Sequence, residues 1–492
     1  MLVSIRAQKP LPLGGLSSDG VHIWEPDLKV IDHLLAHDEF IDILWQSFHR
    51  THPKARKTGR NRMALNRSLR TAALKHIKCW SFPDTYKELQ RNLDYRAFTQ
   101  FFDEKIPVAS TLSRNLACID AQAVRALNEH LIVVARQRAV VQGRAYRQDT
   151  TVCESNVHYP TDSSLLQDGV RVLQRLAGRA AELVPALGQL RDRAKAVRNR
   201  VLEITRAARS RGEQAKRHRE TSYRALLRIV RPVVTGAGRI AGKLGDRRVT
   251  RHLGWQEESV AKALKADLDT MGERVERVIR QTRARVCRGI TDWPGKLLSL
   301  FVPRTAVIRK GKAHKPNEFG RLIDIVEVEN GIVADYQVLD GNPDDGSLLL
   351  PALERHRPRF GRVPHLVATD RGFWSAKNER AAHALGVKRV AIPATGKLAR
   401  ARLRVQRSRW FRQAQRWRAA GEGRIGTLKN VFGMDRCMYK DVDARADDAM
   451  ERWVGWCVFA NNLVFVARAL RRQQSDGHQG GPTARQSDQA AA

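Results

Sequence analysis

The chain has 492 residues, more than one typical hydrophobic core accommodates, so two or three domains are expected. Its 88 lysines and arginines exceed its 51 aspartates and glutamates, and the formal net charge of +37 indicates a polyanionic partner. The basic residues recur along the chain instead of clustering beside an apolar segment, which favours nucleic acid over a membrane surface. The alternative is a soluble protein that is simply basic.

Cysteine usage and apolar segments indicate a cytoplasmic protein. The six cysteines include no Cys-x2-Cys pair, which predicts neither a disulfide framework nor a zinc site and fits a reducing compartment. The first residues lack the continuous apolar core of a signal peptide. The most apolar late segment, residues 453–470, is short and interrupted by Asn461, Asn462 and Arg468. We therefore expect a buried helix there and no membrane association.

Residues 1–28 are expected to be a tail, and residues 29–145 have a helical, basic pattern that predicts a DNA-binding domain. The segment HPKARKTGRNR is too charged and too rich in turn residues to be core. We interpret it as a DNA-facing loop, whose candidate DNA-binding residues are Lys54, Arg56, Lys57 and Arg60.

Three short helices are expected next, in FPDTYKELQRNL, DYRAFTQFF and ASTLSRNLACID, with start signals at Asp84 and Ser110. This arrangement suggests a helix-turn-helix. The first turns of its recognition helix would supply DNA-binding residues, namely Ser110, Thr111, Ser113 and Arg114. An ordinary helical bundle is the alternative.

The segment YRQDTTVCESNVHY is rich in β-branched residues and predicts a strand that contains Asp149. A long helical stretch follows, at about residues 163–305. Apolar residues recur in it at steps of three and four over 187–208 and again over 260–278. Because TGAGRIAGKLGD separates the two stripes, we expect a helical hairpin inserted into the domain that begins with this strand, and its outer arginines either pack or contact DNA.

Strand patterns resume near Arg321. The segments RLIDIVEVE and IVADYQVLD flank Asn330 and Gly331, a strong signal for an antiparallel hairpin. A helix in LLLPALERH, a strand in PHLVATD, a helix in AKNERAAHALG, a strand in VKRVAIP and a helical region through Glu422 follow. The order is that of an RNase H-like fold.

The expected fold class is therefore α/β. It comprises an RNase H-like mixed sheet with flanking helices over residues 146–470, a helical N-terminal DNA-binding domain and the helical insertion. Residues 471–492 are rich in Gln, Gly, Ser and Ala and are expected to be a disordered tail.

Three carboxylates are candidates for chemistry. Asp370 follows an apolar strand, so it is expected at the carboxyl edge of the sheet, where ligands commonly bind. Asp149 lies on the first strand, which neighbours that edge in the proposed fold. Glu422 lies between two glycines in a helical run, where each glycine costs roughly 1 kcal/mol relative to alanine. Taken alone, each carboxylate could also be a turn, surface or helix-break residue.

Arg418, Glu422 and Lys429 lie on one face of a continuous helix by their spacing. The carboxylate would then have a cation on either side along the helix. We expect Arg418 and Lys429 to bind DNA phosphates, because their side chains are donors only.

The segments QDTTV, ATDRGF and RWRAAGEGRIGTLKNVFGMDR resemble the three active-site segments of bacterial insertion-sequence transposases of the DDE class. The resemblance spans roughly residues 147–470. Many relatives carry Tyr-x2-Arg-x3-Glu-x6-Lys, and Arg418, Glu422 and Lys429 are in register with it, whereas Gln415 replaces the tyrosine. Better-known relatives place an inserted domain just before the glutamate, but here it follows the first aspartate.

The resemblance implies two Mg²⁺ ions, or Mn²⁺ in their place, held by Asp149, Asp370 and Glu422. Such a site would cut DNA at the terminal inverted repeats of an insertion sequence and transfer the 3′-OH ends into target DNA. A homodimer or larger assembly on DNA is expected. The alternatives are another RNase H-like nuclease, such as a resolvase, and a non-catalytic DNA-binding protein derived from a transposase.

Overall fold

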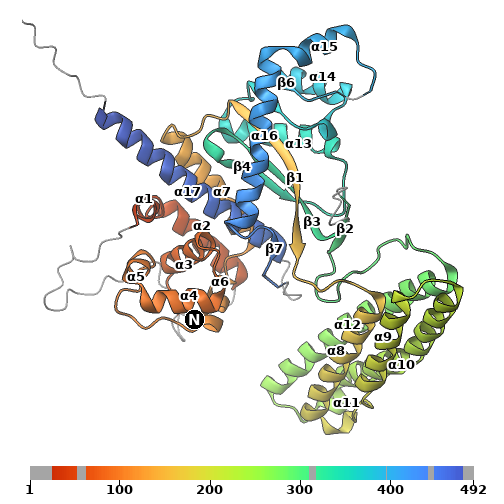
Figure 1. The fold of residues 1–492 in the computed structure, drawn as a ribbon. Helices are drawn as coiled ribbons and strands as arrows, with labels where there is room; N and C mark the ends of the chain where they lie inside the picture. The colour runs from red at the N-terminus through yellow and green to blue at the C-terminus, as the bar shows by residue number, and fades with distance from the viewer. Residues whose placement is uncertain (1–24, 53–61, 310–316, 395, 441–447, 480–492) are drawn as a thin grey trace, which may run out of the picture. The chain divides into compact units, whose positions relative to one another are not determined.

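The protein is described by a computed structural model that covers residues 25–52, 62–309, 317–394, 396–440 and 448–479. The chain divides into two compact units (Figure 1). We call the first the sheet unit, which comprises the described residues up to Asn156 and from Ile308 onward. The second, the helical unit, comprises Val157–Val307 and interrupts the sheet unit in sequence.

A mixed sheet forms the centre of the sheet unit (Figure 1). Its path is β2-β3-β1-β5-β6, with β4 also beside β3 and β7 also beside β1. Strand β1 is antiparallel to β3 and parallel to β5, which is in turn parallel to β6. The strands are β1 (Ala145–Ser155), β2 (Ala306–Ile308), β3 (Glu318–Glu327), β4 (Val333–Val338), β5 (Leu366–Ala368), β6 (Arg389–Ala391) and β7 (Arg436–Cys437).

The predicted hairpin between β3 and β4 is confirmed. Asn330 and Gly331 have φ angles of 58° and 75°, the positive values that favour asparagine and glycine in such turns. The Asn330 side chain also donates a hydrogen bond of 2.7 Å to the carbonyl oxygen of Val140. The turn is thus fixed both by its backbone conformation and by a contact outside the hairpin.

Helices cover the sheet of this unit. Its helices are α1 (Pro26–Leu34), α2 (Asp38–Thr51), α3 (Leu65–Ile77), α4 (Phe82–Arg91), α5 (Leu93–Phe98), α6 (Ala109–Leu116), α7 (Ala121–Gln137), α13 (Leu349–Phe360), α14 (Ala376–Ala384), α15 (Arg400–Arg407), α16 (Arg409–Asn430) and α17 (Ala449–Gln479). The predicted order of strands and helices is confirmed from β3 as far as α16, whereas β2 was not predicted.

The N-terminal helices share an apolar core with the sheet instead of forming a separate compact body. One buried cluster joins Leu69 of α3, Leu127 of α7, Ile325 of β3 and Trp456 of α17. Because α17 comes from the far end of the chain, both termini of the described sequence contribute to this core (Figure 1). The expected domain of residues 29–145 therefore belongs to the same compact unit as the sheet.

Helix α17 is long and apolar but mostly buried. Among the described helices it alone passes as a possible membrane span by length and hydropathy, over Ala449–Ser475, and 83% of its apolar window is buried inside the protein. It is therefore the buried helix that the sequence predicts. The helix runs to Gln479, so the expectation of disorder from residue 471 is wrong for residues 471–479, and residues 480–492 lie outside the described residues.

The helical unit is a bundle and not the two-helix hairpin that we expected. Its main elements are α8 (Asp162–Leu183), α9 (Ala194–Arg209), α10 (Glu213–Gly245), the short α11 (Arg247–Thr250) and α12 (Trp255–Arg288). They enclose their own apolar core, to which Leu173, Val197, Leu226 and Val275 contribute.

The error arose from the glycines of TGAGRIAGKLGD, which we interpreted as a turn. This segment lies almost wholly within α10 because Ala237, Ile240 and Leu244 continue its buried face. A Cβ on Gly236 would stand 2.5 Å from Leu190, so this glycine permits close packing. The chain instead reverses between α10 and α12, around α11.

Candidate active site

Strand pairing brings Asp149 and Asp370 to neighbouring positions. In the parallel pair of β1 and β5, Arg147 is opposite Ala368, and each aspartate follows two residues later on its own segment. Both side chains are half-buried. Asp149 accepts a 2.7 Å hydrogen bond from the Thr150 amide, and Asp370 accepts a 2.8 Å hydrogen bond from the Gly372 amide, which caps the short turn after β5.

Helix α16 packs over the face of β1 that carries Asp149. A hollow of about 300 Å³ lies between the helix and the strands. It contains Asp149 but neither Asp370 nor Glu422. The residues that line it are Arg147, Gln148, Asp149, Ile325, Glu327, Arg418, Gly421, Arg424 and Ile425.

A buried ion pair forms one wall of the hollow. The guanidinium of Arg147 donates to both carboxylate oxygens of Glu327, at 2.9 and 2.5 Å, and also to the carbonyl oxygen of Trp417 on α16. Burial raises the pKa of Glu327, while Arg147 and the nearby Arg424 oppose that rise. Arg147 thus links the strand that bears Asp149 to the helix that bears Glu422.

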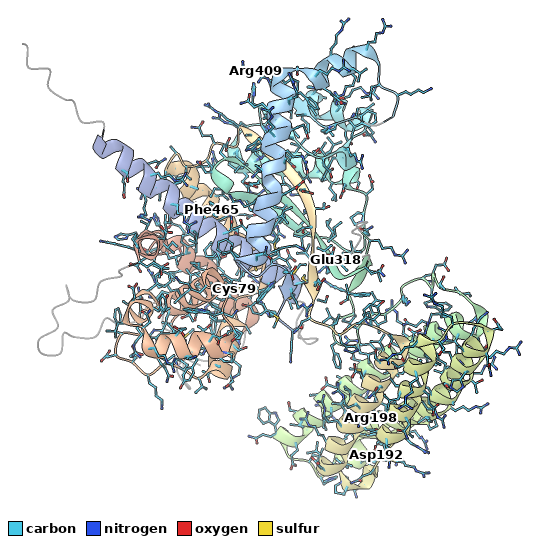
Figure 2. The ribbon with its side chains drawn as sticks, in the orientation of Figure 1. Cys79, Asp192, Arg198, Glu318, Arg409 and Phe465 are labelled. Carbon is cyan, nitrogen blue, oxygen red and sulfur yellow. The ribbon has the colours of Figure 1, made fainter. Side chains whose placement is uncertain are left out.

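A second arginine strengthens this link. Arg424 of α16 lies 3.5 Å from Glu327, and its guanidinium is 3.9 Å from the centroid of the Phe465 ring on α17. Phe465 is labelled in Figure 2. The helix is therefore held against β3 by a charge contact and against α17 by a cation–π contact.

The two glycines beside Glu422 have different surroundings. A Cβ added to Gly421 would lie 3.0 Å from Nε of Arg147, whereas a Cβ added to Gly423 would meet nothing within 4 Å. The predicted reason for these glycines, close approach of the helix, therefore applies to Gly421 alone. The structure offers no steric reason for Gly423.

The charged residues on the polar face of α16 differ in their exposure and in their partners. Glu422 is 70% exposed and lies 3.7 Å from Arg418, whose side chain is 20% exposed. Lys429 is only 14% exposed and lies 3.6 Å from Asp435. Arg418 faces the hollow and Lys429 already has a carboxylate partner, so the two predicted phosphate ligands are not equivalent.

The three candidate carboxylates suit a hard divalent cation but do not converge. Their oxygens are the ligands that Mg²⁺ prefers, and they come from adjacent strands and from the helix that packs on β1. Within the described ranges, however, no three His, Cys, Asp or Glu side chains lie close enough to hold a metal ion. The donor chemistry therefore fits, while the side chains are not gathered around a common point.

Gln415 occupies the position at which the resembling transposases have a tyrosine. Its amide nitrogen donates to the carbonyl oxygen of Thr369 at 3.2 Å and to that of Ala391 at 2.5 Å. These carbonyls lie at the ends of β5 and β6, immediately before Asp370 in the first case. Gln415 therefore fixes α16 over the edge of the sheet, a role that the sequence motif did not indicate.

Asp345 is a further carboxylate near Asp370 that we did not identify from the sequence. A Cβ on Gly372 would stand 3.0 Å from an Asp345 oxygen and 3.1 Å from an Asp370 oxygen. Asp345 also accepts a 3.0 Å hydrogen bond from the Thr150 hydroxyl, next to Asp149. Asp345 begins a single turn of 3-10 helix (Asp345–Ser347) after β4, and this short segment has no periodic pattern from which the proximity could be predicted.

The helix start signals that we assigned near residues 81–110 need correction. Helix α4 begins after Ser81, whose hydroxyl accepts from the Asp84 amide while the Asp84 carboxylate accepts from the Ser81 amide. Asp84 is thus the third helical residue and not the cap. Helix α6 begins at Ala109 without a side-chain cap, so Ser110 lies inside it.

The connection between α5 and α6 does not match a helix-turn-helix. It spans residues 99–108, much longer than the three or four residues of that motif. The structure favours the alternative of a helical bundle. Ser110 and Arg114 are exposed, Thr111 and Ser113 are half-buried, and Arg114 donates back to Ser110 and Thr111 of its own helix. The other predicted DNA-binding residues, Lys54, Arg56, Lys57 and Arg60, lie outside the described residues.

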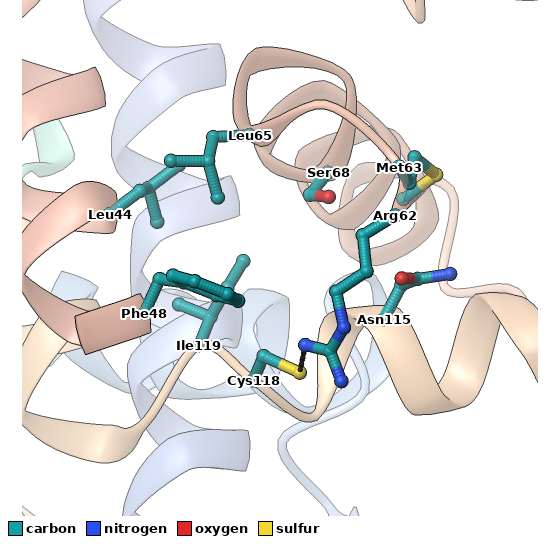
Figure 3. A pocket seen from close by; sticks show the side chains of 9 residues that line it. All are labelled: Leu44, Phe48, Arg62, Met63, Leu65, Ser68, Asn115, Cys118 and Ile119. Carbon is teal, nitrogen blue, oxygen red and sulfur yellow. Dashed lines mark hydrogen bonds between the residues drawn. The ribbon is translucent and has the colours of Figure 1, made fainter. Parts of the chain in front are cut away.

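A second hollow, of about 310 Å³, lies among the N-terminal helices (Figure 3). Its walls are mainly apolar, and Arg62 donates a 2.7 Å hydrogen bond to the sulfur of Cys118 inside it. None of the candidate carboxylates lines it. Of these two hollows, the one beside Asp149 is therefore the one that a candidate carboxylate lines.

Comparison with known families identifies the N-terminal region. Residues 25–117 match the family model described as transposase domain (DUF772). The match supports a transposase family. No curated protein and no solved structure matches the chain.

The matched region spans α1–α6 and ends before β1. The transposase match therefore lies wholly in the N-terminal helices, which share their core with the sheet that carries Asp149. A transposase would act on DNA, and the net charge of +37 agrees with such a partner.

Proposed function

We propose that the protein is a DDE-class transposase that cuts DNA at the ends of an insertion sequence and transfers the 3′-OH ends into target DNA. The parallel pairing of β1 and β5 is the main support, because it brings Asp149 and Asp370 to neighbouring positions. Glu422 completes the proposed set from α16, which packs over the face of β1 that carries Asp149.

The fold supports this proposal. After β1 come the β3–β4 hairpin, α13, β5, α14, β6 and the helices α15 and α16. This is the order that we expect for an RNase H-like catalytic domain, with the helical unit inserted between β1 and β3.

Asp149, Asp370 and Glu422 would hold two Mg²⁺ ions, which when bound stabilise both the attacking and the leaving oxygen of phosphoryl transfer. Glu422 must turn away from Arg418 to join the aspartates. That change costs little free energy, because Glu422 is 70% exposed and its 3.7 Å contact with Arg418 is long, and such ion pairs contribute about 1 kcal/mol or less.

Arg418 is the best-placed residue to hold a phosphate at this site. It lines the hollow beside Asp149, and its Nε is buried with no hydrogen-bond partner in the described structure. A phosphate oxygen would accept a hydrogen bond from that donor. After Glu422 has turned away, the phosphate would also replace the Glu422 carboxylate as the charge partner of Arg418. Arg147 and Gln415 act indirectly, because they hold α16 against the sheet.

Two reactions would use the same site. Water would first attack the phosphorus at an element end and release a 3′-OH. That 3′-OH would then attack a target phosphodiester and displace a second 3′-OH, without a covalent protein–DNA intermediate. We propose a homodimer or larger assembly on DNA, because both ends of an element must reach one target.

The test is Mg²⁺-dependent nicking and joining of DNA that carries the element's terminal repeats. Asp149→Asn, Asp370→Asn and Glu422→Gln should each abolish both reactions while DNA binding persists, because each removes a ligand charge at nearly constant size. Glu354→Gln, at an exposed carboxylate of α13, is the matched control and should keep full activity.

The outcomes separate the alternatives. Nicking without joining would indicate an RNase H-like nuclease or resolvase. DNA binding without any nicking in Mg²⁺ or Mn²⁺ would indicate a non-catalytic protein. Near wild-type nicking by one of the three variants would remove that residue from the site.

A further inference from the structure

The end of the helical unit formed by residues 245–255 exposes a large aromatic side chain. Trp255, the first residue of α12, is 82% exposed, more than any other large hydrophobic residue in the described part of the chain. Burial of a tryptophan removes roughly 150–250 Å² from water, so a partner that covered this side chain would gain a large apolar contact. We call residues 245–255 the bundle tip.

Several exposed cations lie close to this tryptophan in the sequence. Arg247, Arg248, Arg251 and His252 are all exposed, and they lie in the short segment between α10 and Trp255. Arg248 and Arg251 have no carboxylate partner among the described ion pairs. The bundle tip therefore presents both positive charge and an aromatic side chain to solvent.

The carboxylates of the tip and of the first turn of α12 are engaged locally. Asp246 accepts a 2.9 Å hydrogen bond from the Arg248 amide, and Glu257 accepts one of 2.9 Å from the Gly254 amide. Glu258 pairs with Lys262 at 2.8 Å, and this contact together with the charge of Arg247 lowers the Glu258 pKa. These contacts order the tip and partly offset Arg247, but they leave the other two arginines available.

The tip lies at the far end of the bundle from the point where the chain enters and leaves it. Asp162, at the start of α8, pairs at 2.6 Å with Arg285, near the end of α12. The 34 residues of α12 span about 50 Å between that end and Trp255. Figure 1 shows α11 at one end of the bundle.

The rest of the helical unit has the same sign of charge. Its sequence contains 32 lysines and arginines but only 15 aspartates and glutamates. Exposed arginines recur on several helices, among them Arg198 of α9, which is labelled in Figure 2. The unit as a whole would attract a polyanion toward the tip.

We infer that the bundle tip is a DNA-binding site in which Trp255 stacks on an unpaired base while Arg248 and Arg251 bind the flanking phosphates. Every base has an aromatic face, so stacking needs no particular sequence, and the phosphates match the arginines in charge. A second copy of the chain could also cover a tryptophan, but the uncompensated arginines favour a polyanion. This inference rests on the proposed function in one respect, the choice of DNA as the polyanion that binds the tip.

The test compares the full-length wild type with Trp255→Ala and Trp255→Phe. The probes are a blunt duplex and the same duplex with an unpaired end that contains 2-aminopurine. Trp255→Ala should bind the unpaired end about ten-fold more weakly, should bind the blunt duplex nearly normally, and should lose the change in 2-aminopurine emission. Trp255→Phe should retain most of both signals, because phenylalanine keeps an aromatic face.

A pair of double variants tests the phosphate contacts. Arg248→Ala with Arg251→Ala should lower affinity and reduce the dependence of log K on log salt by about one for each phosphate that the protein no longer binds. Arg280→Ala with Arg283→Ala removes two exposed arginines from the other half of α12 and should change both quantities less.

Unchanged binding and emission in Trp255→Ala would overturn the inference. The inference would also be overturned if Trp255→Ala lowered the molar mass measured by sedimentation but left DNA binding unchanged. That result would show that a second copy of the chain covers Trp255. These failures differ from failure of the proposed function, which would appear as the absence of Mg²⁺-dependent nicking in the wild type whatever residue 255 is.

Discussion

Gly421 of α16 lies against the guanidinium of Arg147 on β1, so closely that a Cβ at Gly421 would stand 3.0 Å from Nε and 3.2 Å from Cζ. The guanidinium cannot easily withdraw, because it is bonded to Glu327 and to the carbonyl of Trp417. The helix that carries Glu422 therefore approaches β1 at a position where only glycine fits without rearrangement.

Alanine substitutions at the two glycines beside Glu422 should have opposite effects. Gly423→Ala should raise the free energy of unfolding by about 0.5–1 kcal/mol, because it removes a helical glycine in open space. Gly421→Ala should lower it by roughly 1–3 kcal/mol, because Arg147 must shift in a packed site. Urea unfolding measures both values. Equal stabilisation by the two alanines would show that α16 does not approach Arg147 as described.

Arg418→Ala should impair DNA cleavage more than Lys429→Ala. Removal of one charged phosphate ligand corresponds to about 1.5–3 kcal/mol, hence a defect of roughly ten- to hundredfold for Arg418→Ala. Lys429 already pairs with Asp435, so its removal should have a smaller effect on the rate. Calorimetry with Mn²⁺ should show metal binding retained in both variants and abolished in Glu422→Gln. Full activity of Arg418→Ala would make this arginine an ordinary surface charge.

Asp324 should make stability fall as the pH rises from about 4 to 7. Burial on β3 raises its pKa to about 7, although Gln148 donates 2.9 Å hydrogen bonds to both carboxylate oxygens. The folded state then keeps a proton that the unfolded chain releases near pH 4, so the stabilisation is complete below pH 4 and is lost through pH 7. Asp324→Asn should flatten this part of the pH profile. A wild-type slope in that variant would assign the effect to another group.

Lys75 should have the opposite influence in the alkaline range. Burial lowers its pKa to about 8, and its ammonium lies 5.0–5.6 Å from the ring centroids of Phe82, Trp453 and Tyr439. Because the folded pKa is below that of the unfolded chain, the free energy of unfolding should rise from pH 8 toward pH 10. Subtraction of the Lys75→Met profile isolates this contribution. Parallel profiles for the two proteins would mean that Lys75 does not titrate in this range.

Local signals in the sequence were sufficient for much of the sheet unit. Asn330 and Gly331 identify the hairpin because the turn itself demands positive φ angles. The strand before Asp370 and the helix through Glu422 follow from apolar periodicity. The helix start at Ser81 was misplaced because Asp84 belongs to the same capping box and carries an equally good cap side chain.

The rest depends on contacts between residues far apart in sequence. Arg147 contacts Glu327, and Gln415 contacts the carbonyls of Thr369 and Ala391, none of which periodicity can pair. Likewise, α10 continues through its glycines because the apolar core of the bundle outweighs a local cost of about 1 kcal/mol for each. The side chains around the candidate site thus follow from tertiary packing, whereas the strands and helix that carry them follow from local pattern.

The antiparallel pairing of β1 with β3 has a consequence for synthesis of the chain. Gln148 and Asp324, whose side chains are hydrogen-bonded across the two strands, are 176 residues apart. At 5–20 residues per second, a ribosome needs roughly 9–35 s to make β3 after β1. During that interval β1 has no partner on this side, and a bare strand edge is prone to aggregation.

The bundle, whose contacts are more local, can fold meanwhile, and the ion pair between Asp162 and Arg285 then draws its two ends together. The folded insertion would then hold the end of β1 near the start of β3, so that the two strands pair sooner.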